Sequence, residues 1–164
     1  MLILHRLKCK TKIPLQIILT LKYLNFFMTT LKEDINWSID WLIKAFKTIN
    51  ITLDFSINSI QNIENFLDEQ LKNNKSKKHN LLSENYGGKL FAISSYIGEV
   101  IIRNTNNSYW VVNDNDPEGE INIEINSKNG IKIYPAQKVI QRINNGKIDN
   151  LYFYVSEIIK VINS

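Results

Sequence analysis

The chain has 164 residues, enough for one domain to bury a sizeable core without disulfides or metals. Hydrophobic residues make up 44% and charged residues 22% of the sequence, a composition typical of soluble globular proteins that excludes a disordered chain and a bundle of membrane helices. Cys9 is the single cysteine, so an internal disulfide is impossible, and the isolated His5 and His79 do not predict a zinc site.

The formal net charge of +4 is unevenly distributed along the chain. Residues 1–27 hold five of the 20 basic residues and none of the 16 acidic ones, so the remaining 15 basic and 16 acidic residues give the rest a charge of −1. A nearly neutral body does not indicate nucleic-acid binding. The dense basic run Lys72, Lys75, Lys77 and Lys78 has no aromatic neighbour for base stacking, and we interpret it as a solvated loop.

Residues 1–27 have the layout of a targeting segment, with basic residues ahead of an apolar run from Ile13 to Leu21. This run is too short to span a bilayer. Met28 opens a sequence typical of a protein start, in which Thr30 can cap a helix. We expect residues 1–27 to be a non-native extension of the start or a targeting-like segment, and residues 28–164 to form a single domain. The alternatives are a true membrane or secretion segment and a helix packed on the domain.

Three helices are expected first along the body of the chain. Apolar residues three and four apart predict a helix over residues 33–49. A second helix should start after Asp54 or Ser56 and pack antiparallel to the first, and a third should span about residues 89–103. The expected core sides are Ile35, Ile39, Leu42, Phe46 and Ile49 in the first, Ile57, Ile60, Ile63, Leu67 and Leu71 in the second, and Leu90, Ile93, Ile97, Val100 and Ile101 in the third.

Strand patterns then replace helix patterns. Residues 109–112 are aromatic and β-branched, and apolar residues alternate with polar ones over residues 120–126 and 131–134. The turn-rich stretches 114–119 and 127–130 have hairpin length, so the three strands should form an antiparallel meander.

Two helices are expected to close the chain. Pro135 suits the first turn of one helix and Gly146 its end, and a last helix should span about residues 149–162. The predicted fold class is therefore α+β, with three N-terminal helices, a three-stranded antiparallel meander and two C-terminal helices.

The third helix contains an unusual glycine. An interior glycine such as Gly98 costs roughly 1 kcal/mol relative to alanine, so we expect another element to approach closely there. Glu99 and Arg103 lie four residues apart and should pair along the helix. The alternative is that Glu99 acts as a general base, although the sequence offers it no partner acid, nucleophile or metal.

The acidic loop of residues 114–120 matches part of the pattern of a calcium-binding loop. Asp114, Asp116 and Glu118 match the first, third and fifth positions of a calcium loop, but Ile125 stands where the last ligand should be, and strands flank the loop. We predict a turn with a solvated acidic rim, with weak calcium binding as the alternative.

Aromatic residues are divided between core and surface. Trp41 and Trp110 are expected in the core. Trp37 and Tyr96 lie toward the edges of their helical stripes and are candidates for contact with a partner, since aromatic residues are favoured at protein interfaces.

The motif Tyr96-Ile97-Gly98-Glu99-Val100-Ile101, followed by Tyr109-Trp110, resembles small uncharacterised bacterial domains in which a Tyr-aliphatic-Gly-Glu-Val helix precedes a Trp-bearing strand. The segment Ile131 to Pro135 is also similar, and the resemblance covers about residues 56–146. Such families are generally of unknown function, and some lie near toxin and immunity genes. The resemblance implies no catalytic residue. It implies that Gly98, Glu99 and Trp110 hold the helix against the meander.

These features lead us to expect a non-enzymatic bacterial protein of the cytoplasm that binds another protein, as an immunity or regulatory partner. We expect no cofactor, no metal, no nucleic-acid partner and no stable membrane insertion. The alternative is a small enzyme with a site near Glu99 and the acidic loop, although no nucleophile elbow or phosphate loop is present. The candidate binding residues are Trp37, Tyr96, Glu99, Asp114, Asp116 and Glu118, and the candidate structural residues are Gly98, Arg103 and Trp110.

Overall fold

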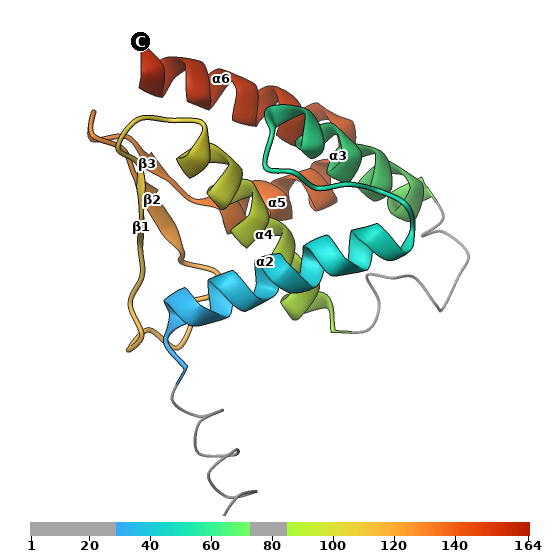
Figure 1. Cartoon of the computed structure of the whole chain (residues 1–164), viewed down its shortest axis with the longest axis horizontal. Helices are drawn as coiled ribbons and strands as arrows, with labels where there is room; N and C mark the ends of the chain where they lie inside the picture. Colours follow the sequence, from blue (N-terminus) through green and yellow to red (C-terminus); the bar gives the residue numbers. More distant parts are fainter. Residues whose placement is uncertain (1–28, 73–84) are drawn as a thin grey trace, which may run out of the picture.

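The computed structural model describes residues 29–72 and 85–164 (Figure 1). The segment 1–27, with His5 and Cys9, therefore lies outside the described residues. So do His79 and the basic residues Lys75, Lys77 and Lys78.

The described residues form five α-helices, one 3-10 helix and three strands, and the expected α+β class and order of elements are confirmed. In chain order they are α2 (Leu31–Thr48), α3 (Ile57–Lys72), α4 (Tyr86–Arg103), β1 (Tyr109–Val111), β2 (Glu124–Asn126), β3 (Lys132–Ile133), α5 (Pro135–Asn145), η2 (Gly146–Asp149) and α6 (Leu151–Asn163). In the described part of the chain, no helix has an apolar stretch long enough to cross a membrane.

Capping residues define where several helices begin and end. Thr30 and Glu33 form a capping box at the start of α2, in which the Glu33 amide donates to the Thr30 hydroxyl at 3.3 Å and the Thr30 amide donates to the Glu33 carboxylate at 2.8 Å. Ser56 accepts from the Ser59 amide at the start of α3. Pro135 occupies the first turn of α5, which Gly146 ends, as predicted.

α4 is the central helix of the molecule (Figure 1). Every residue from Leu90 to Ile101 except Glu99 is buried, because α2, α3, α5 and α6 all pack on it. α2 lies across one side of α4, whereas α3 packs mainly on α6.

The expected antiparallel pairing of α2 with α3 is wrong. The connection between them runs back along the molecule, so both helices run in the same direction (Figure 1). The physical reason is that their apolar stripes face different partners, with α2 packed on α4 and α3 on α6.

The sheet is the expected meander in the order β1-β2-β3, with both pairs antiparallel. Trp110 is paired with Ile125, and Ile125 with Ile133, so these three buried residues form one row across the face turned to the helices.

The second strand is shorter than predicted. It starts at Glu124 rather than at residue 120, because the amides of Ile121 and Asn122 both donate to the carbonyl of Glu118 and close a helical turn. Ile121 is consequently exposed, while Ile123 and Ile125 are buried as expected.

Candidate functional site

Two tryptophans on α2 remain exposed although the helix is well packed. The face of α2 toward α4 is already filled by Ile35, Ile39, Leu42 and Phe46. Trp37 and Trp41 lie four residues apart on the flank of this stripe, with 64% and 49% of their surfaces exposed. The prediction that Trp41 lies in the core is therefore wrong, because Leu42, one residue further along the helix, takes the core position. Trp37 is on the surface, where a binding residue needs to be.

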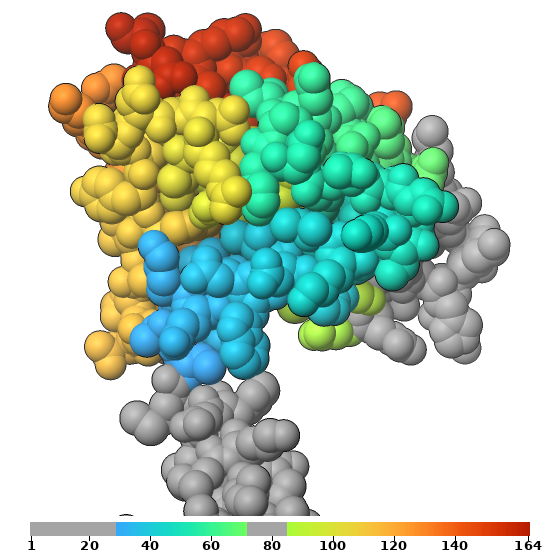
Figure 2. Space-filling view, viewed as in Figure 1, coloured from blue at the N-terminus to red at the C-terminus, as the bar shows by residue number. Residues whose placement is uncertain are grey.

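A groove of about 650 Å³ lies between α2 and the first turns of α4, and we call it the α2–α4 groove. Figure 2 shows α2 along the lower edge of the molecule, with the start of α4 emerging beneath it. Phe91 and Ala92 are buried residues that form part of the lining, and the two tryptophans contribute from α2. The full lining is Thr29, Asp34, Trp37, Ser38, Trp41, Asn85, Gly88, Phe91, Ala92 and Glu120.

A small apolar pocket of about 150 Å³ adjoins the groove, since Trp41 lines both. Its lining includes Phe46 and Phe66, whose ring centroids are 4.9 Å apart. Leu42, Ala45, Ile49 and Ile93 supply further apolar surface. The pocket is therefore a place for a hydrophobic group.

The opposite end of the groove is acidic. Asp34 and Glu120 line the groove and also a third cavity of about 320 Å³, which the acidic loop surrounds. We define the acidic rim as Asp34, Asp114, Asp116, Glu118 and Glu120. In the part of the chain that the structure describes, none of these five carboxylates forms an ion pair.

Two of the predicted loop acids have structural contacts. Asp114 accepts a hydrogen bond of 2.6 Å from the backbone amide of Leu31 and so ties the loop to the start of α2. Asp116 accepts from the Asn122 side chain and the Glu118 amide, both at 2.9 Å, and these two bonds lower its pKa. Among the described residues, no three His, Cys, Asp or Glu side chains are grouped as a metal site would need. Glu118 is exposed on the rim.

Tyr96 is a core residue rather than a surface residue. Its side chain is completely buried and its hydroxyl accepts from the Phe55 amide at 2.9 Å and lies 2.7 Å from the Ser59 hydroxyl. The ring stacks on Phe55 with centroids 5.2 Å apart, and burial raises the pKa of the phenol. Tyr96 therefore joins α4 to the segment ahead of α3 and offers no surface to a partner.

Glu99 makes contacts within the domain through both carboxylate oxygens. One oxygen accepts from the Arg103 guanidinium at 2.9 Å and the other from the Trp110 indole at 3.2 Å. The ring of Trp110 lies against Gly98, where an added Cβ would come within 2.0 Å of the indole. Arg103 also lies over the Phe55 ring, 3.6 Å from its centroid. The predicted close approach at Gly98 and the pairing of Glu99 with Arg103 are both confirmed, and Glu99 lines none of the three cavities described above.

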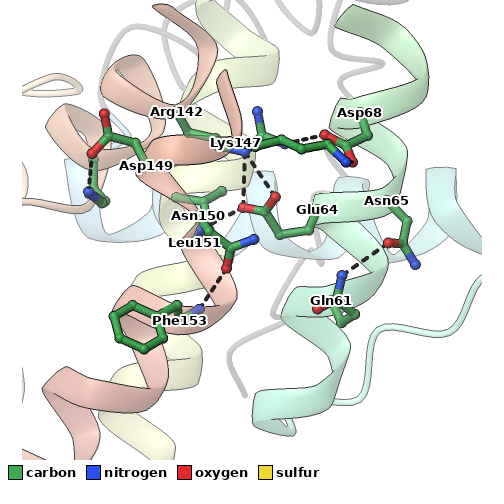
Figure 3. Close-up of polar contacts among 11 residues, drawn as sticks. Gln61, Glu64, Asn65, Asp68, Arg142, Lys147, Asp149, Asn150, Leu151 and Phe153 are labelled. Atoms are coloured by element: carbon green, nitrogen blue, oxygen red, sulfur yellow. Dashed lines mark hydrogen bonds and ion pairs between the residues drawn. The ribbon is translucent and has the colours of Figure 1, made fainter. Parts of the chain in front are cut away.

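A buried ionic network joins α3, α5 and α6 (Figure 3). Arg142 is completely buried and donates from Nε to both oxygens of Glu64 at 2.9 and 3.1 Å, and from Nη2 to Asp68 at 2.6 Å. Glu64 also accepts from the Leu151 amide at the start of α6, and Lys147 pairs with Asp68 at 2.9 Å. With its charges paired inside the domain, this network is an internal link between helices.

Sequence reasoning missed this network. The available signal is that Arg142 lies three residues after Val139 and that Glu64 lies four after Ile60, so that both occupy core spacings. Such spacing predicts a buried ion pair only when the helices that carry the two charged residues are known to pack together. The order of the helices along the chain does not show that α3 and α5 lie side by side.

Comparison with known proteins gives a family. The family model described as "Uncharacterised protein YwmA" matches residues 24–129, which include α2, α3, α4, β1 and β2. Neither a curated protein nor a solved structure matches the chain. The chain belongs to the YwmA family.

Proposed function

We propose that this member of the YwmA family is a non-enzymatic module that binds a segment of another protein in the α2–α4 groove. The observation that carries the proposal is the exposure of Trp37 and Trp41 along a groove of about 650 Å³. Tryptophan is enriched at protein interfaces and among the residues that contribute most to binding, because it buries a large apolar area with little loss of conformational freedom.

The chemistry of the groove favours a protein over the other partner classes. Its charged lining residues are Asp34 and Glu120, which repel the phosphates of nucleic acids. Catalysis at Glu99 is disfavoured because Arg103 and Trp110 occupy both carboxylate oxygens. A module without a reaction of its own acts by covering a surface of its partner, as an immunity or regulatory protein does. We propose that this binding takes place in the cytoplasm.

Affinity capture with groove variants tests this function. We would use the tagged full chain, its Trp37→Ser/Trp41→Ser variant and a Phe153→Ser control to capture partners from a lysate of the native host. Phe153 is 66% exposed on α6 and does not line the groove, so the control loses an exposed aromatic elsewhere.

The proposal expects one stoichiometric protein that the unmodified chain and the Phe153 control retain and the double variant loses. Equal capture by all three chains would contradict it, provided that circular dichroism shows the same thermal unfolding for each.

A further inference from the structure

From the charge pattern around the α2–α4 groove, we infer the kind of segment that it binds: an amphipathic segment with cationic residues at one end and a large apolar side chain at the other. This inference rests on the proposed function and adds the chemistry of the partner. It is carried by the acidic rim, by the small apolar pocket and by the spacing between them.

The acidic rim gathers five carboxylates around one cavity, whereas the carboxylates that form ion pairs lie elsewhere in the domain. Glu99, Glu124 and Asp149 each form an ion pair with an Arg or Lys of the chain, and Asp68 forms two. The five rim carboxylates have no such partner among the described residues. Carboxylates gathered without positive partners repel one another. A cationic group bound here is therefore attracted by all five carboxylates of the acidic rim.

The apolar pocket has the size of one side chain. A dry cavity of about 150 Å³ lined by aliphatic and aromatic residues can hold a benzene molecule. The pocket beside Trp41 has about the same volume, and its lining is aliphatic and aromatic apart from Thr48 and Lys89. A Leu, Ile, Met or Phe side chain fits this description, and burying one such side chain contributes roughly 1.5–3 kcal/mol.

The two features lie along one flank of α2. Asp34, Trp37, Trp41 and Ala45 follow each other at intervals of three and four residues, so they line one side of the helix. With a rise of 1.5 Å per residue, the distance along α2 from Asp34 to Ala45 is about 16 Å. A partner helix of about three turns spans this length, with its cations at the Asp34 end and its apolar anchor at the Ala45 end.

Designed peptides provide the test. The first is a fluorescein-labelled helical peptide of about three turns, built from Ala, with Lys at one end and Leu facing the pocket at the other. In the second, Glu replaces every Lys, and in the third, Ser replaces every Leu. Fluorescence anisotropy against the full chain measures binding at low and high salt, and the peptides contain no tryptophan.

The expected result is that the Lys–Leu peptide binds at least about tenfold more tightly than either other peptide and that added salt weakens it. The Asp34→Asn/Glu120→Gln variant should lose most of the preference for Lys over Glu. A charge-matched control, Asp40→Asn/Glu69→Gln, changes two exposed helical carboxylates that do not line the groove, and it should keep this preference.

Two outcomes overturn the inference. Equal binding of the Lys and Glu peptides, lost in Trp41→Ser, would remove the cationic partner while leaving the groove as a binding site. A preference for Lys that is the same in the rim variant and the charge-matched control would show that Asp34 and Glu120 do not attract the cationic residues of the partner. The capture experiment with Trp37→Ser/Trp41→Ser stays independent of both, so the proposed function and this inference can fail separately.

Discussion

Gly98 shows how one missing side chain sets the position of the sheet. The indole of Trp110 occupies the space where a Cβ at residue 98 would lie, and the same indole donates to Glu99 on the next position of α4. A ring packed flush on the helix backbone and held by a hydrogen bond fixes β1 against α4. The glycine is needed for this close approach, and its conformational freedom plays no part, since only Gly130 and Gly146 have positive φ among the described glycines.

A Gly98→Ala substitution is expected to destabilise the domain by about 1–3 kcal/mol, because a methyl group would force the Trp110 ring away from α4. Gly87→Ala is the matched control. Gly87 lies in the first turn of the same helix with nothing within 4 Å of an added Cβ, so alanine there should be neutral or stabilise by up to about 1 kcal/mol. Urea denaturation of both variants measures the difference, and a Gly98→Ala protein as stable as the original would contradict this account.

At the scale of elements, the C-terminal helices are held by ionic contacts as well as by apolar packing. Arg142 on α5 reaches Glu64 and Asp68 on α3, and Glu64 accepts from the first amide of α6 (Figure 3). Removing one member of a buried charged set leaves the others without compensation.

Arg142→Ala is therefore expected to lower the free energy of unfolding by about 3–5 kcal/mol. Lys160→Ala serves as the comparison, because its ion pair with Glu157 is exposed at both side chains and such pairs contribute about 1 kcal/mol or less. Chemical denaturation under the same conditions gives both values. Similar losses in the two variants would show that the buried network contributes no more than a surface pair.

The network also predicts a pH dependence. Partial burial alone would raise the pKa of Asp68, but hydrogen bonds and charges from Lys147 and Arg142 outweigh it and lower this pKa below its ordinary value. A carboxyl group with a lowered folded pKa stabilises fully above the pKa of the unfolded state, about 3.9 for Asp, and this contribution is lost as the pH falls through the folded pKa.

Asp68→Asn should accordingly destabilise the protein at pH 7, and the difference from the unmodified chain should shrink as the pH falls below about 4. Urea midpoints measured for both proteins between pH 7 and pH 3 provide the comparison. A difference that stays constant over this range would mean that the Asp68 charge does not contribute.

The order and type of the elements could be predicted from the sequence because each helix or strand is a local pattern. The stripe of α2, the cap at Thr30 and the proline and glycine at the ends of α5 depend only on near neighbours. The shortened β2 could not be predicted, since the turn at Glu118 overrides the alternation at Ile121 and Ile123.

The candidate site could be predicted only in part for the same reason. Trp37 and Glu120 line the same groove, although 83 residues separate them in the chain. Tyr96, which was expected on the surface, is in the core, and Trp41, which was expected in the core, is exposed. Which flank of a helix is covered depends on which helices pack together. Spacing identifies the two edges of a stripe but does not show which edge another element covers.

At the scale of the whole molecule, α4 is enclosed along most of its length, and the groove lies where its first turns pass beside α2. This face combines two exposed tryptophans, an apolar pocket and an acidic rim whose carboxylates form no ion pair within residues 29–72 and 85–164. Those three properties lie together on one face, and they are the basis of the proposal that the molecule acts by binding.

The most direct measurement is site-specific photo-cross-linking on this face. A photoreactive phenylalanine analogue would replace Trp37 in one full-length protein and Phe153 in another, and both would be irradiated in a lysate of the native host. The account predicts that the residue 37 probe forms a cross-link to one protein, at a segment that mass spectrometry shows to be basic and amphipathic, and that the residue 153 probe does not. Cross-links of the same kind from both positions, or none from residue 37, would contradict the claim that the α2–α4 groove is the binding site.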